Sequence, residues 1–162
     1  MDDDSPYGRV TDPERYAVLH DAARSLIDDL AERFDVAVTE LEPEAGHVPR
    51  PALSTTRVTP AGAGAPVVIT LTGFPGLWVT FGARHEEGFP HCGCDACDED
   101  PQDVLEDLLL KVGAVTLGGF QETRRGYAFT HADGSSSSGD DPGRAPRDPT
   151  SYAPWPVRRT AG

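Results

Sequence analysis

The chain has 162 residues and a formal net charge of -13, from 14 Lys and Arg against 27 Asp and Glu. This excess of acid argues against binding to nucleic acid or anionic lipid, because both need Lys and Arg to meet phosphate groups. The longest apolar run, residues 65–69, is far shorter than the ~20 residues of a membrane-spanning helix. The acidic start Met1-Asp2-Asp3-Asp4 is unlike a secretory leader. We therefore expect a soluble, cytoplasmic protein of ordinary domain size.

Two helices are predicted from apolar residues that recur three and four positions apart. The first covers residues 11–34, where Asp12 followed by Pro13 is typical of an N-cap with proline in the first helical position. Thr11 with Glu14 would form a capping box one residue earlier. The second covers residues 100–117 and begins with the same Asp-Pro pattern. Gly118-Gly119 then ends it.

Strands are predicted from alternating apolar residues and from turn sequences between them. The clearest case is a hairpin around Gly73-Phe74-Pro75-Gly76. The predicted strands cover residues 36–41, 53–58, 67–72 and 77–81, and residues 120–130 form a further strand or hairpin. Because the strands cluster rather than alternate with helices, the fold class is α+β, a mostly antiparallel sheet with two main helices. The sequence has neither the glycine-rich turn of a dinucleotide-binding fold nor a phosphate-binding loop.

The composition changes after residue 131. Residues 1–131 are predicted to form a single α+β domain with a metal loop at residues 85–98. Residues 132–162 are rich in Ser, Gly and Pro and are predicted to form a flexible tail. The aromatic residues of 152–156 give the end of this tail a means of docking on the domain.

All three cysteines fall within six residues, as Cys92, Cys94 and Cys97. Their odd number and the expected cytoplasmic location argue against a disulfide framework and favour a metal site. Thiolates select zinc or iron–sulfur clusters among the common metals, and we predict a structural Zn²⁺. Thiols without metal and a catalytic or iron–sulfur site remain the alternatives.

A tetrahedral zinc needs a fourth ligand besides the three thiolates. His91 directly precedes Cys92, and two neighbouring side chains rarely reach one ion without strain. His85 stands further upstream, before a Gly and a Pro that allow the chain to fold back. We therefore predict His85 as the fourth ligand, with His91, Asp95 or a distant residue as alternatives.

The stretch Gly88-Phe-Pro-His-Cys-Gly-Cys-Asp-Ala-Cys-Asp-Glu99 resembles the signature of an actinobacterial family, domain of unknown function 6226. Residues 7–11 and the hairpin around residues 74–76 also resemble this family, so that the resemblance covers roughly residues 7–130. The resemblance implies a histidine upstream of the cysteines, which favours His85 over His91. It implies no activity, substrate or partner.

Residues 85–107 contain nine acidic residues and no Lys or Arg. We interpret most of these carboxylates as a solvated face, because no nucleophile and base stand in a recognisable pattern. The resulting hypothesis is a small zinc-stabilised domain, a protein-binding or regulatory module whose partner is a basic protein. The alternatives are a metal-dependent enzyme with an open zinc position and a redox sensor that uses the thiols and their zinc. The sequence indicates neither a substrate nor an oligomeric state.

Overall fold

A computed structural model describes residues 9–42, 51–141 and 148–159 of the chain. Two α-helices and two antiparallel sheets make up these residues, so the α+β class is confirmed. The helices are α1 (Val18–Arg33), which follows the short 3-10 helix η1 (Pro13–Ala17), and α2 (Pro101–Thr116). None of the helices in these ranges is long and apolar enough to cross a membrane.

The larger sheet has five strands in the order in which they occur along the chain. They are β1 (Val36–Leu41), β2 (Ala52–Pro60), β3 (Val67–Thr72), β4 (Gly76–Phe81) and β5 (His85–Phe89). The predicted hairpin is confirmed as β3 and β4, which pair from Val67 with Phe81 to Thr72 with Gly76. Strand β5 was not predicted, because Glu86, Glu87 and Gly88 are poor strand formers. It forms through its pairing with β4.

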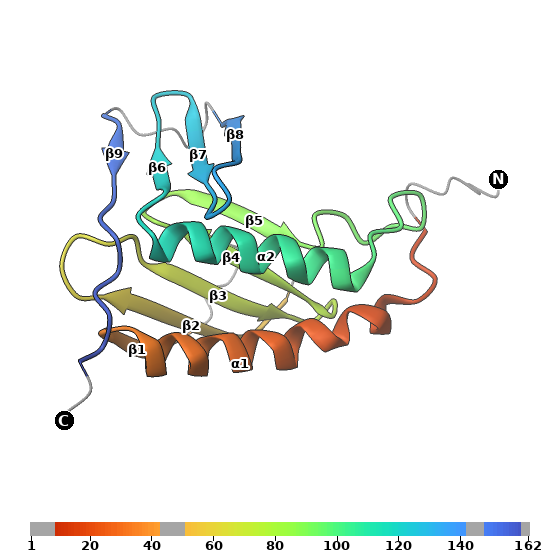
Figure 1. Cartoon of the computed structure of the whole chain (residues 1–162). Coiled ribbons are helices and arrows are strands. Elements are labelled where there is room, and N and C mark those ends of the chain that lie inside the picture. The colour runs from red at the N-terminus through yellow and green to blue at the C-terminus, as the bar shows by residue number, and fades with distance from the viewer. Residues whose placement is uncertain (1–8, 43–50, 142–147, 160–162) are drawn as a thin grey trace.

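The smaller sheet has the strand order β8-β7-β6-β9. Its members are β6 (Phe120–Glu122), β7 (Gly126–Thr130), β8 (Ser136–Asp140) and β9 (Thr150–Ser151). Strands β6 and β7 pair as a hairpin within residues 120–130, where a strand or hairpin was predicted. Figure 1 shows this sheet standing at one end of the molecule, beside α2.

Both helices lie across one face of the five-stranded sheet (Figure 1). The apolar stripes of the helices meet the inward residues of β3 and β4 in one core of fully or nearly fully buried side chains, which includes Tyr16, Leu19, Leu30, Val67, Ile69, Val79, Phe81, Leu108 and Val112. The inward positions of β5 continue this face, but two of the three are polar, His85 and Glu87. The core therefore ends at β5 in a pair of buried polar groups.

The helix ends agree with the predicted caps in one case and differ in the other. Asp100 caps α2 as predicted, since its side chain accepts a hydrogen bond from the Gln102 amide at 2.8 Å. Asp12 stands at the N-cap position with Pro13 directly after it, as predicted, but its side chain makes no capping hydrogen bond and the first turn is 3-10. The neighbouring Thr11 instead donates from its amide to Asp95 at 2.8 Å, across the fold.

The predicted flexible tail differs from the structure in the parts that the model describes. The serine run forms β8 against β7, and the chain then returns through β9 to bury Trp155 at 3 % exposure. The Trp155 indole donates to the Ala65 carbonyl at 2.9 Å and meets Phe34 edge to face. Composition does not show this order, because strand pairing uses backbone groups and one buried Trp anchors many polar residues. Residues 142–147 and 160–162 of the predicted tail lie outside the described residues.

Replacing Trp155 by Ala should lower the free energy of unfolding by about 3–5 kcal/mol, the usual cost of removing a large aromatic side chain from a core. Val157→Ala is the matched control, because Val157 lies two residues away and is 71 % exposed. This control should change the free energy of unfolding by less than about 0.5 kcal/mol. Urea unfolding followed by circular dichroism measures both. Equal, small losses in the two variants would show that the segment does not belong to the core.

Candidate metal centre

The cysteines lie on the connection from β5 to α2, which we call the cysteine loop (residues 90–99). In Figure 1 this loop lies beside the described start of the chain, at the end of the molecule away from the smaller sheet. Its two flanks are fixed, by the pairing of β5 with β4 on one side and by the Asp100 cap of α2 on the other.

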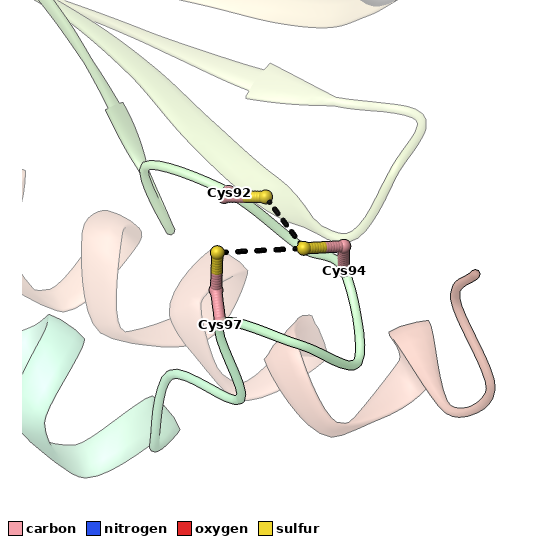
Figure 2. Close-up of side chains that lie close together, drawn as sticks. All are labelled: Cys92, Cys94 and Cys97. Atoms are coloured by element: carbon pink, nitrogen blue, oxygen red, sulfur yellow. Dashed lines mark hydrogen bonds between the residues drawn. The ribbon is translucent and has the colours of Figure 1, made fainter. Parts of the chain in front are cut away.

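The three thiols point toward one another (Figure 2). The Cys94 sulfur lies 3.0 Å from that of Cys92 and 3.4 Å from that of Cys97. All three sulfurs lie within 4.8 Å of one another, and none is in a disulfide. With zinc–sulfur bonds of ~2.3 Å, tetrahedral geometry separates two sulfurs by about 3.8 Å, so a small spreading of this cluster makes room for the ion. Cys94 is buried and Cys97 is exposed.

The thiols influence one another's ionisation. The hydrogen bond from Cys92, together with contacts from Cys97, lowers the pKa of Cys94. The hydrogen bond to Cys94 raises the pKa of Cys97 in turn. A negative charge is therefore favoured on the sulfur of Cys94 over that of Cys97.

Gly93 stands between Cys92 and Cys94. Its φ is not in the positive region that favours glycine. The structure gives another reason, because a Cβ at this position would lie 2.2 Å from Cζ of Phe74. Phe74, at the tip of the β3–β4 hairpin, thus packs directly on the backbone of the cysteine loop.

Glu99 closes the loop by joining its end to its beginning. One carboxylate oxygen accepts from the Cys92 amide at 2.8 Å, and the other lies 3.3 Å from Nδ1 of His91. Glu99 was expected to be one of the solvated acids of residues 85–107. Its contacts show that it positions the first of the three cysteines.

His85, the predicted fourth ligand, does not lie with the three sulfurs. Its Nε2 is 2.9 Å from a Glu87 oxygen, and its ring stacks on Tyr127 with 3.6 Å between centroids. The physical reason is β5 itself. An extended strand advances ~3.3 Å per residue, and His85 pairs with Phe81 at the end of β5 opposite to the cysteines.

The alternative ligands are also held elsewhere. His91 lies 3.1 Å from Glu87, and Asp95 accepts hydrogen bonds from the amide and the hydroxyl of Thr11. Within the described ranges, the group of metal-ligating side chains that contains the cysteines has no fourth member. The prediction of three cysteine ligands is thus compatible with the geometry, whereas no described side chain joins them.

A buried ion pair that was not predicted joins β5, which leads into the cysteine loop, to α2. Lys111 of α2 donates to Glu87 at 2.6 Å and to Asp107 at 2.9 Å, and Lys111 and Glu87 are less than a tenth exposed. Lys111 is the only lysine of the chain and falls on the apolar side of a predicted helix. That position was the available signal for a buried charge.

Glu87 remains ionised at this site. Burial alone would raise the pKa of Glu87, but hydrogen bonds from His85, His91 and Lys111 outweigh burial and hold this pKa well below its usual range. Burial would likewise lower the pKa of Lys111, and the bond to Glu87 raises it instead. Glu87, His91 and Asp107 lie close enough to hold a metal ion. The Lys111 ammonium already stands between the two carboxylates as their cation.

An acidic cleft of about 350 Å³ opens between the cysteine loop and the first turns of α2. Its lining combines two apolar side chains with one histidine and five carboxylates. The lining residues are Phe89, His91, Asp98, Glu99, Asp100, Asp103, Val104 and Asp107.

A family model described as "Family of unknown function (DUF6226)" matches residues 2–159, and the chain therefore belongs to this family. The resemblance seen in the cysteine stretch is thus confirmed at the level of the family. No curated protein and no solved structure matches the chain.

The buried Glu87 predicts a specific dependence of stability on pH. A carboxyl group whose pKa is depressed by folding stabilises the fold fully above its unfolded pKa, near 4.5, and less as the pH falls below that value. Glu87→Gln should therefore be less stable than the wild type by about 3 kcal/mol at pH 6, and the difference should shrink towards pH 3.5. Urea unfolding at several pH values measures this difference. The exposed control Glu106→Gln should show no such dependence, and a constant difference for Glu87→Gln would contradict the assignment.

Proposed function

We propose that this member of a family of unknown function is a small domain that binds one Zn²⁺ through Cys92, Cys94 and Cys97. We further propose that it presents the acidic surface beside this site to a basic protein. The observation that carries the proposal is the convergence of the three sulfurs on a loop that other elements hold in place. A reducing compartment such as the cytoplasm keeps these thiols available to a metal.

The donor set favours a structural role for the ion. Three thiolates place so much negative charge on zinc that it becomes a weak Lewis acid, whereas catalytic zinc sites commonly use His and carboxylate ligands. The carboxylates near the cysteines are engaged in positioning: Glu99 holds the Cys92 amide, Asp95 holds Thr11, and Asp98 pairs with Arg15 at 2.7 Å. The three thiolates and the engaged carboxylates therefore favour an ion that stabilises the conformation of the loop over an ion that takes part in catalysis.

The acidic cleft supports the proposal that the partner is a basic protein. Five carboxylates and two apolar side chains line the cleft, and a Lys or Arg side chain combines a cationic head with an apolar stem. The bound ion with three thiolates carries one further negative charge. A basic segment that enters the cleft thus gains both apolar contact and charge complementarity.

Metal analysis of the purified, reduced protein tests the first part of the proposal. The wild type should contain about one zinc per chain, and Cys94→Ser should lose most of it, because a serine hydroxyl stays protonated near neutral pH and ligates zinc poorly. Ala96→Ser introduces the same hydroxyl at an exposed position of the same loop and should keep the zinc. A wild type that stays free of metal after exposure to Zn²⁺ would contradict the site.

A synthetic peptide of ten lysines tests the acidic surface. Asp103→Asn combined with Glu106→Gln removes two exposed charges of α2 beside and within the cleft, and it should weaken binding of the peptide several-fold in fluorescence anisotropy. Asp28→Asn combined with Glu32→Gln removes the same charge from the exposed side of α1. Equal weakening by the two double variants would show that only net charge attracts the peptide, and it would contradict a localised surface.

A further inference from the structure

The cysteine loop is attached to a segment near the start of the described chain, through pairs of residues that are more than 80 positions apart. This segment, residues 9–17, contains η1 and leads into α1. The Asp95 amide donates to the Arg9 carbonyl at 2.8 Å, and both donors of Thr11 reach the Asp95 carboxylate. Further along, Arg15 pairs with Asp98 at 2.7 Å, and the Tyr16 hydroxyl donates to the Glu99 carbonyl at 2.6 Å.

We propose that metal binding at the three cysteines and docking of residues 9–17 on the cysteine loop are coupled, so that the metal controls whether this segment is attached. The inference rests on the proposed function, since it concerns the regulation exerted by the same site. It adds that metal binding affects the attachment of the segment that leads into α1.

The positions of the contacts in the loop support this coupling. Asp95 lies between two of the cysteines, and Asp98 directly follows the third with a φ of +42°, a conformation rare for a residue other than glycine. The path of the backbone around the sulfurs therefore decides where the Asp95 and Asp98 side chains stand. A metal that fixes the three sulfurs fixes both carboxylates in the positions that Thr11 and Arg15 meet.

The docked segment also reaches the interior of the protein. The Tyr16 side chain is fully buried, and its ring lies 6.0 Å from that of Phe74, the residue that packs on Gly93 of the cysteine loop. The loop, the tip of the β3–β4 hairpin and η1 thus share one set of contacts. A change in the loop is passed to η1 by packing as well as by hydrogen bonds.

Outside this anchor, the contacts lie at the surface, where each single hydrogen bond or ion pair contributes little. These contacts must act together to hold the segment. They suffice only if the loop is already ordered, because ordering both the loop and the segment costs conformational entropy. Metal binding orders one partner in advance. By linkage, the docked segment must then raise the affinity for metal by the same factor by which metal favours docking.

Two measurements on the full-length protein test the coupling, both in the presence of a reductant so that no disulfide forms. The first is hydrogen–deuterium exchange of the peptide that covers residues 9–17, with Zn²⁺ and after chelation. The second is the Zn²⁺ affinity of Thr11→Val, obtained by competition with a chromogenic chelator. Thr11 is exposed and lies outside the cysteine loop, so this variant leaves the sequence of the loop unchanged and removes one contact between the segment and Asp95.

Thr39→Val is the matched control, because it makes the same change at an exposed position of β1. We expect chelation to increase exchange in residues 9–17 and Thr11→Val to weaken Zn²⁺ binding by about fivefold or more, with Thr39→Val unchanged. Unaltered exchange together with equal affinities of both variants would overturn the coupling and leave the metal site intact. A wild type that binds no Zn²⁺ would instead refute the proposed function and the coupling with it.

Discussion

A single buried carboxylate, Glu87, joins the three parts of the structure that build the candidate site. It lies on the edge strand β5 and receives hydrogen bonds from His85 of the same strand, Lys111 of α2 and His91 of the cysteine loop. Removing one partner from a buried ion pair is costly, because the remaining charge has no water to solvate it. The contact with Glu87 therefore holds His91, at the start of the cysteine loop, in place. His91 in turn contacts Glu99, and Glu99 accepts a hydrogen bond from the amide of Cys92, the first of the three cysteines.

The cysteine loop depends on residues far from it in the sequence. Phe74 restricts position 93 to glycine, and Thr11 and Arg15 hold the acidic residues between and after the cysteines. The position of the three thiols thus depends on packing and hydrogen bonds from residues that are distant in the sequence. A metal that binds there acts on a loop whose neighbours include η1, the β3–β4 hairpin and α2.

Local patterns in the sequence predicted those features that depend on neighbouring residues. The β3–β4 hairpin, the Asp100 cap and the cysteine cluster follow from alternation, capping chemistry and short spacing. Strand β8 depends on pairing with β7, and a serine-rich composition says nothing of it. The aromatic residues of 152–156 did indicate a docking segment, but its receiving residues, such as Ala65 and Phe34, are evident only in the fold. His85 was selected because it is near in sequence, but the extended strand β5 carries it away from the sulfurs. Lys111 was overlooked because its partner, Glu87, becomes evident only when β5 and α2 meet.

The central claim is that Cys92, Cys94 and Cys97 bind one zinc ion together. X-ray absorption at the zinc K-edge of the purified protein tests it most directly, because the fine structure gives the type, number and distance of the ligand atoms. Our account predicts about three sulfur atoms at ~2.3 Å from the zinc, with the rest of the coordination made by a lighter atom. A first shell of nitrogen and oxygen alone would contradict it.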